Sequence, residues 1–470
     1  MVNPLLVRYL FYPLHERLMK RPTFEYFSEL ESNQWLTRVE IEKLQEQKLT
    51  ELLKSACTHT PWHRERILAA GIDPDGYVTL EHLRTLPVMD KQDAATHGDR
   101  MVWRGVPGGV FKYNTGGSSG QPLIFHYGRR RQASDAAGRM RARRWWGVEP
   151  GDPEVYLWGA PVELDKTDRV KTFRDRLLNQ LVLNAFEMSP ASMDAYARAI
   201  QSYQPCCIYG YASSLALFAA HVIERSIRFR LPRLKVVCTT GEPLFEHQRR
   251  LIGNAFQVPV ANEFGSRDIG FTAHETPEGQ MLLMSESIIM EVLDTQGLPV
   301  PPGETGEVVL TALESHAQPF IRYRTGDMAR ISGDSCHAGR GLHVIGEVLG
   351  RMTDFIVRSD GMIMHALAVI YVLRAVEGVA EFKIVQHTVH DIEVLVVPNA
   401  DWKETALASI EHGLQKRLGG DIRLDIRLVD VIPPESSGKY RYVVSEVPLP
   451  GSLQVAMKSP TNCSGSVDQR

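Results

Sequence analysis

The sequence predicts an α/β protein with a large N-terminal domain and a small, mobile C-terminal α+β domain. Short apolar runs alternate with amphipathic stretches between residues 155 and 262, which indicates βαβ units in a parallel sheet. Residues 281–311 instead alternate in polarity between Gly/Pro turns, which indicates an antiparallel, β-rich subdomain. A change of composition near Gly350 begins the small domain. We therefore predict domains at residues 1–349 and 350–449.

The elements follow from local periodicity. The first hundred residues are polar and helical, since Ile41, Leu44, Leu49, Leu52 and Leu53 recur at helical spacing. The predicted strands of the large domain are 155–158, 206–209 and 234–239, and the helices between them are 191–202, 213–224 and 246–256. In the small domain we predict a strand pair at 381–385 and 392–397, a helix at 403–418 and a strand at 422–428. The polar tail 450–470 is expected to be disordered.

Composition narrows the class of function. The 470 residues are 43% apolar and carry a formal net charge of −3. This composition does not indicate a nucleic-acid-binding protein. Six scattered cysteines indicate a reducing compartment, and no apolar run approaches a membrane span. The apolar N-terminus is broken by Pro4, Arg8 and Pro13, so we do not expect a signal peptide there. We expect a cytoplasmic protein without membrane insertion.

Residues 129–144, which directly follow Gly128, contain many arginines. We favour the solvated face of a helix for them. A patch for an anionic partner, such as a phosphopantetheine carrier or the CoA nucleotide, is the alternative.

The most informative stretch runs from Tyr113 to Leu123 and reads YNTGGSSGQPL. Its glycines permit positive φ, so backbone N–H groups can converge on an anion, and its hydroxyls add donors. The loop residues in question are Thr115, Gly116, Gly117, Ser118, Ser119 and Gly120. The Gly-Lys-Ser/Thr ending of a Walker A loop is absent. A polyphosphate loop and a plain hairpin turn remain equal alternatives for this stretch alone.

Later segments carry further polar chemistry in a fixed order. Residues 239–243, TTGEP, follow a predicted strand, where parallel sheets bind ligands. Residues 262–270, NEFGSRDIG, offer an aromatic ring and Asp268, whose carboxylate suits Mg²⁺. In residues 322–328, RYRTGDM, Asp327 can accept both hydroxyls of a ribose. Finally, residues 350–356 read GRMTDFI, and Lys439 lies in PPESSGKY. Each alone is also read as an ordinary turn, cap or solvated lysine.

Together this ordered set, from Tyr113 to Tyr440, resembles the adenylate-forming superfamily of acyl-CoA synthetases, and within it the phenylacetate–CoA ligase branch with its capsule-biosynthesis-like members. The resemblance implies an ATP-dependent ligase in two half-reactions. A carboxylate attacks the α-phosphate of ATP, which gives an acyl-adenylate and pyrophosphate. A thiol, usually that of CoA, then displaces AMP. The implied cofactors are ATP, Mg²⁺ and CoA.

The resemblance also implies roles for single residues. The loop from Thr115 to Gly120 would hold the β- and γ-phosphates, and Lys439 would stabilise charge at the α-phosphate. Asp354 would be the hinge of the small domain, with Arg351 near the ribose that Asp327 holds. The implied nucleotide site further comprises Gly241, Glu242, Pro243, Glu263, Phe264, Gly265, Ser266 and Asp268.

The chain departs from the family's pattern at several positions. Phe264 replaces a tyrosine and Asp268 a glutamate, and Arg267 replaces a small hydroxyl residue beside the metal carboxylate. At the position of a structural zinc site of this branch, the sequence reads Cys336-His337-Ala338, with Thr276 upstream. Four tetrahedral ligands are not evident, so we expect no structural zinc.

The acyl pocket is less defined. Trp158, Tyr209, Gly210 and Tyr211 follow predicted strands, where aromatic rings suit an aryl or apolar acid. Core packing is the alternative, and we favour it for Tyr209. The expected partners are a small carboxylic acid and CoA or an acyl carrier protein, and a homodimer is left open. Two other functions stay open: acyl transfer to an amine, hydroxyl or carrier protein, and a non-catalytic nucleotide-binding module.

Overall fold

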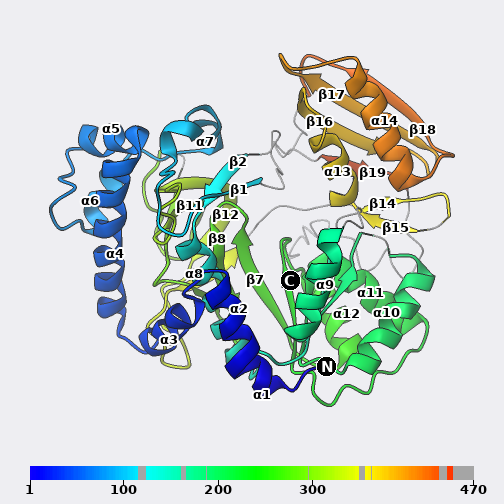
Figure 1. Ribbon diagram of the computed structural model, residues 1–470, viewed down its shortest axis with the longest axis horizontal. Helices are drawn as coiled ribbons and strands as arrows, with labels where there is room; N and C mark the ends of the chain where they lie inside the picture. The colour runs from blue at the N-terminus through cyan, green and yellow to red at the C-terminus, as the bar shows by residue number, and fades with distance from the viewer. Residues whose placement is uncertain are drawn as a thin grey trace, which may run out of the picture.

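The structure is a computed structural model that describes residues 1–114, 123–159, 166–186, 188–294, 296–348, 355–360, 362–432 and 442–447. A large α/β body carries a C-terminal α+β domain, coloured orange in Figure 1. This combination of helices and large β-sheets confirms the predicted α/β fold class. The predicted boundary at residue 350 and the tail 450–470 lie outside the described residues.

One mixed sheet organises the body. Its strands are β3 (Glu154–Trp158), β4 (Gln180–Asn184), β5 (Cys207–Tyr211), β6 (Val236–Thr240), β7 (Val260–Ser266), β8 (Gly270–Glu275), β9 (Met281–Leu283), β10 (Ile288–Leu293), β11 (Thr305–Ala312), β12 (Tyr323–Ile331) and β13 (Val344–Val348). Their order is β10-β11-β12-β13-β9-β8-β7-β6-β5-β3-β4. From β4 to β7 neighbouring strands pair in parallel, whereas from β7 onward every pair is antiparallel. Strand β7 is therefore the seam between the two halves.

Helices cover the parallel half as βαβ crossovers require. Helix α8 (Arg129–Trp145) packs against β8 of the antiparallel half, and the helices of the parallel half are α9 (Lys166–Leu177), α10 (Pro190–Tyr203), α11 (Ala212–Glu224) and α12 (Glu246–Phe256). The last three lie together beside the sheet in Figure 1. A continuous apolar core joins α10–α12 to β3, β5 and β6, and it includes Leu217, Phe218 and Val237, each at most 1% exposed. The predicted helix at 246–256 agrees with α12 at both ends.

The first hundred residues are helical, as the periodicity predicts. The helices are α1 (Pro4–Leu6), the π-helix η1 (Val7–Phe11), α2 (Tyr12–Leu18), α3 (Thr23–Asn33), α4 (Arg38–His59), α5 (Pro61–Ala69), α6 (Leu80–Thr85), α7 (Lys91–Thr96) and the 3₁₀-helix η2 (Gly98–Met101). Thr37 caps α4 in a capping box with Glu40, which fixes where this helix begins. The hairpin β1 (Phe111–Asn114) and β2 (Ile124–Tyr127) follows, paired antiparallel.

The C-terminal domain is a four-stranded sheet with helices. Its elements are β14 (Phe355–Val357), β15 (Ile363–His365), α13 (Leu367–Arg374), β16 (Val379–Gln386), β17 (Asp391–Pro398), α14 (Thr405–Leu418), β18 (Arg423–Leu428) and β19 (Val443–Ser445). The sheet order is β18-β17-β16-β19. The predicted pair at 381–385 and 392–397 is the antiparallel pair of β16 and β17. Ile410, Leu414 and Leu418 of α14 are buried, as their spacing predicts.

Two expectations about surfaces can be compared with the fold. The favoured interpretation of the arginine-rich helix is wrong, because Arg131, Arg141 and Arg143 on α8 are all at most 5% exposed. Arg141 forms an ion pair with Glu286, also fully buried, and donates to the carbonyl of Leu30 at 3.0 Å. In the part of the chain that is described, no helix has both the length and the apolarity needed to cross a bilayer.

Candidate active site

The predicted ligand-binding edge is formed by the carboxyl ends of β5, β6 and β7. Tyr211 lies opposite Thr240, and Thr239 lies opposite Asn262 in the parallel ladder. The segment of residues 239–243 and the segment of residues 262–270 are thus neighbours at the seam of the sheet. Since the carboxyl ends of parallel strands open into the crevice where ligands bind, this edge is the candidate active site.

The four residues predicted for the acid pocket gather into one aromatic group. The rings of Trp158 and Tyr211 stack with centroids 4.3 Å apart, and Trp158 also stacks on Tyr209 at 5.6 Å. Phe186, which the sequence analysis missed, continues the stack beyond Tyr211 at 6.5 Å. A Cβ on Gly210 would meet the Leu157 carbonyl oxygen at 2.6 Å, so glycine allows the strands to approach here. Tyr209 and Tyr211 are buried, and Trp158 is half-buried.

The backbone conformation at residue 241 requires glycine. Its φ is +75°, and a Cβ would lie 3.2 Å from the ring of Tyr211. The neighbouring Glu242 turns its carboxylate to the start of α11, where it accepts hydrogen bonds from the N–H of Ser213, at 2.9 Å, and from its hydroxyl. The Glu242 carboxylate therefore caps α11.

Glu263 is the buried carboxylate at the centre of this edge. It is 5% exposed, and its Oε1 accepts hydrogen bonds from the hydroxyls of Tyr209, at 2.7 Å, and Thr240, at 3.1 Å. Its Oε2 lies 3.8 Å from Arg139 and 4.0 Å from Arg143. Burial, followed by the Glu263 charge, raises the pKa of Tyr209, so this tyrosine stays a hydroxyl donor. Glu263 thus ties β5, β6 and β7 to helix α8.

Asp268 lies in the tight turn between β7 and β8. Its Oδ2 accepts a hydrogen bond from the Tyr323 hydroxyl at 2.8 Å. Tyr323 belongs to the segment of residues 322–328 on β12, so this bond joins two of the predicted segments. The turn itself is closed by Ser266, whose hydroxyl accepts from the Ile269 N–H at 3.2 Å.

The same turn is supported from below by α8. Arg131 donates to the backbone carbonyls of Asp268 and Arg267 at 2.6 and 2.5 Å. Asp135 accepts from the N–H of Phe271 at 3.0 Å. Arg131, Asp135, Arg139 and Arg143 are spaced four residues apart and form one stripe along the helix. This repeated four-residue spacing is visible in the sequence and could have indicated the stripe.

The segment of residues 322–328 is anchored at its start by Arg322. Arg322 pairs with Glu291 through two contacts of 2.9 Å and is buried. Gly326 has a φ of +75°, and the Asp327 N–H donates to the Thr325 hydroxyl at 3.1 Å. Asp327 is half-buried, on the strand that brings Tyr323 to Asp268. Most of the segment belongs to β12, whose pairing with β11 has a local register shift, whereas the sequence alone also allowed an ordinary turn.

Arg267 links the site to the C-terminal domain. Its guanidinium lies over the ring of Tyr113 at 5.6 Å and over that of Tyr371, on α13, at 5.5 Å. Phe186 also meets Tyr371, with ring centroids 6.2 Å apart. The departure noted at Arg267 therefore has a structural consequence, since this side chain contacts both the β1 strand and the small domain.

Fewer contacts define the remaining predicted residues. Phe264 and Gly265 lie on β7, and Phe264 packs partly buried against the core of the antiparallel half. Thr115 to Gly120, Arg351, Asp354 and Lys439 fall outside the described residues. Cys336 is buried beside Ile41 and Leu342.

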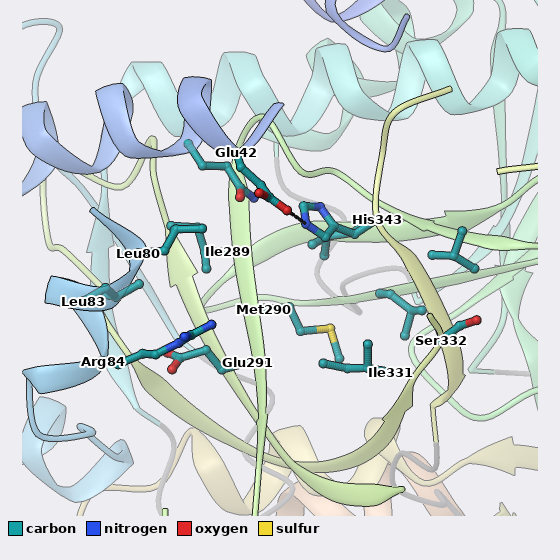
Figure 2. Close-up of a pocket in the computed structure, with 14 residues that line it drawn as sticks. Glu42, Leu80, Leu83, Arg84, Ile289, Met290, Glu291, Ile331, Ser332 and His343 are labelled. Carbon is teal, nitrogen blue, oxygen red and sulfur yellow. Dashed lines mark ion pairs between the residues drawn. The ribbon is translucent and has the colours of Figure 1, made fainter. Parts of the chain in front are cut away.

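A separate cavity of about 220 Å³ lies on the antiparallel half, between α4, α6 and strands β10, β12 and β13 (Figure 2). Glu42 and His343 lie at one end, with Oε1 and Nε2 3.7 Å apart, and His343 Nδ1 is 2.8 Å from the Ser285 hydroxyl. Burial, and then Arg38, lower the pKa of His343 to about 3, so it is neutral near pH 7. Arg84 and Glu291 lie at the other end. None of the residues predicted for the nucleotide or the acid lines this cavity.

The chain is similar to several known proteins. The family described as the CapK C-terminal domain matches residues 356–446. Protein CapK of Staphylococcus aureus is 22% identical over 374 residues, which are 79% of this chain and 82% of that protein. The phenylacetate–coenzyme A ligase of Thermus thermophilus is 25% identical over 464 residues, 89% of this chain and 99% of the ligase. The chain is similar to CapK and to the phenylacetate–CoA ligases. The resemblance inferred from the sequence is thereby confirmed.

Solved structures agree with the fold. A 2-hydroxyisobutyryl-CoA ligase, solved with 2-HIB-AMP and CoA in its thioesterification state, superimposes with a TM-score of 0.58 at 22% identity, over 89% of this chain and 92% of that one. The same ligase in its postadenylation state gives a TM-score of 0.57 at 23% identity, over 88% and 91%. These likenesses support the α/β body with its C-terminal domain.

Proposed function

We propose that this protein is an ATP-dependent, AMP-forming ligase that joins an organic acid to CoA. The observation that carries the proposal is the hydrogen bond from Tyr323 to Asp268 at the seam of the sheet. It brings the expected metal carboxylate and the expected ribose segment together beside the carboxyl ends of β5, β6 and β7. The relatives named as phenylacetate–CoA ligases support the same chemistry.

The chain's own residues fit the nucleotide and its metal. Asp268 supplies a half-buried carboxylate, and hard cations such as Mg²⁺ prefer oxygen ligands. Mg²⁺ would neutralise phosphate charge there. Gly241, whose missing Cβ leaves the crevice edge open beside Tyr211, would let the backbone of residues 241–243 lie against the adenine. Asp327 would accept the ribose hydroxyls. Glu263, whose Oε1 accepts hydrogen bonds from two hydroxyls and whose Oε2 lies 3.8 Å from Arg139, would hold the strands in place.

The proposed reaction has two balanced steps. A carboxylate oxygen of the acid bonds to the α-phosphorus of ATP while the bond to the β-phosphate oxygen breaks, and pyrophosphate leaves. The CoA sulfur then bonds to the acyl carbon, AMP leaves with the bonding electrons, and the thiol proton passes to solvent. Lys439, on its Ser/Gly loop, would stabilise the charge at the α-phosphate in the first step.

The aromatic stack favours an apolar acid, aryl acids included. Trp158, Tyr211 and Phe186 stack beside the carboxyl ends of the parallel strands, and flat rings pack well in offset stacks. Only Trp158 of these is appreciably exposed, so it is the residue we expect to touch the acid first.

Lys439→Ala tests the proposal. It should lower acid-dependent ATP–pyrophosphate exchange by about 10²–10³-fold, the usual effect of losing one preorganised charge contact. It should largely spare thioester formation from a supplied acyl-adenylate. Lys403→Ala, an exposed lysine of the same domain, is the matched control and should have no effect. Normal adenylation by Lys439→Ala would contradict the assignment. AMP release measured with CoA, and separately with hydroxylamine, identifies the acceptor.

A further inference from the structure

An amphipathic helix lies on the surface at the N-terminus. The elements α1, η1 and α2 run in direct succession from Pro4 to Leu18, so they form one helix about 20 Å long. In Figure 1 it lies at the lower edge of the body, in dark blue, outside the sheet. It takes no part in the proposed active site.

The inner side of this helix is firmly attached. Val7 is fully buried, and a Cβ on Gly151 would meet it at 3.0 Å, so the loop before β3 lies directly against the helix. Arg8 donates to the Pro150 carbonyl at 3.0 Å. Glu16 is 2% exposed and accepts hydrogen bonds from Arg21 and, at 2.5 Å, from Thr23. The helix is thus docked on the body in a fixed rotation.

The outer side is apolar and exposed. Tyr9 is 72% and Leu18 74% exposed, values normally seen for charged residues. The stripe consists of Leu5, Leu6, Tyr9, Leu10, Leu14 and Leu18, which we call the outer stripe. Leu10, Leu14 and Leu18 follow at intervals of four. The π-turn, in which the Tyr12 N–H bonds to the Val7 carbonyl, widens the helix and keeps Leu10 on the side of Leu5.

Within residues 1–21, the exposed Lys and Arg side chains have no exposed acidic counterpart. Residues 1–21 contain four basic residues, Arg8, Arg17, Lys20 and Arg21, and one acidic residue, Glu16, which is buried and paired. Arg17 and Lys20 are exposed at the carboxyl end of the helix. Within the described residues neither is within 4.0 Å of a carboxylate.

We propose that this helix docks the protein on an anionic phospholipid surface, with the outer stripe among the acyl chains and Arg17 and Lys20 among the headgroups. A fixed helix with leucines and a tyrosine on one side and cations at its border has the composition of interfacial helices. Membrane charge complements the cations. A second copy of this chain would offer the same helix, which has no exposed acidic residue to pair with them. Docking of this kind needs no spanning segment and is independent of the proposed catalytic function.

The experiment is flotation of the full chain with phosphatidylcholine vesicles, with and without about 30% phosphatidylglycerol. The expected result is binding to the anionic vesicles that weakens with added salt. Leu10→Glu/Leu14→Glu should lower the bound fraction at least about tenfold, because it places charge in the apolar layer. Arg17→Glu/Lys20→Glu should abolish the preference for anionic lipid.

Matched controls lie elsewhere on the surface. Leu298→Glu removes a leucine that is 58% exposed in another loop, and Arg250→Glu reverses an exposed charge on α12; both should bind as the unaltered chain does. Thermal melting verifies folding, and Leu18→Glu, at the last residue of α2, replaces the double variant if that one melts early. Three results would overturn the proposal: no flotation of the unaltered chain, unchanged binding by the leucine variants, or a dimer that Leu18→Glu converts to a monomer.

Discussion

The hydroxyl of Tyr323 holds the carboxylate that we assign to Mg²⁺. The tyrosine is 2% exposed, its ring packs edge-on against Phe320 at 5.0 Å, and its oxygen lies 2.8 Å from Asp268 Oδ2. Tyr323→Phe removes this one oxygen and leaves the ring packing in place. The substitution therefore isolates the orientation of Asp268 from the folding of β12.

The size of the effect follows from the type of bond. A hydrogen bond to a charged acceptor contributes about 1.5–3 kcal/mol, and every 1.4 kcal/mol corresponds to a factor of ten. Residues that orient a metal ligand typically change metal affinity by about 10–100-fold when replaced. Asp268 is half-buried, so water partly compensates for the lost donor. We expect the Mg²⁺ concentration for half-maximal ATP–pyrophosphate exchange to rise about tenfold.

The assay is a magnesium titration of this exchange at saturating ATP. Tyr77→Phe is the matched control, because the Tyr77 hydroxyl also donates to a carboxylate, Glu46 at 2.9 Å, but on the exposed N-terminal helices. It should leave the titration unchanged. A Tyr323→Phe variant with the magnesium dependence of the unaltered chain would refute the reasoning and remove Asp268 as the metal ligand.

Three further predictions concern stability and the crevice. Glu263→Gln should destabilise the fold by roughly 3 kcal/mol, seen as a lower melting temperature, because the buried Arg143 and the partly exposed Arg139 lose their counter-charge; an unchanged melting temperature would contradict this. Burial lowers the pKa of His63 to about 3 and of His316 to about 4 from the ordinary 6.5, so the unfolded chain takes up protons first as pH falls. The free energy of unfolding in urea should therefore decrease between pH 6.5 and 4, by up to about 1.4 kcal/mol per pH unit for each histidine, and His63→Gln/His316→Gln should flatten that slope. Gly241→Ala should cost roughly 1–2 kcal/mol and weaken ATP binding, because φ is +75° and Tyr211 is 3.2 Å from the new Cβ; ATP affinity equal to that of the unaltered chain would oppose this placement.

Local periodicity was sufficient to predict most helices and strands of the α/β body. Buried strands followed by amphipathic helices leave a signal within ten or fifteen residues, and the helix expected at 246–256 has those bounds in the structure. The segment of residues 262–270 was harder. We interpreted it as a loop, yet Val260–Ser266 is strand β7 and pairs with β8. Gly265 and Ser266 have low strand propensity, and only the non-local partner makes them a strand.

The arginines of α8 show what sequence patterns miss. A charged residue counts as exposed in any pattern, and Arg131, Arg141 and Arg143 are buried because their partners are brought in by the tertiary fold. Arg141 meets Glu286 and Arg131 meets the turn at Asp268, both more than a hundred residues away. The same holds for Tyr323 and Asp268, whose hydrogen bond no spacing rule predicts. The order of the segments indicated a nucleotide site, whereas the contacts that build it needed the structure.

Exchange of labelled pyrophosphate into ATP tests the central claim most directly. The folded chain, with Mg²⁺ and a panel of aryl and medium-chain acids, should catalyse exchange that depends on at least one acid and on the metal. Tight ATP binding without exchange for any acid would contradict the claim and would favour a nucleotide-binding protein without ligase activity.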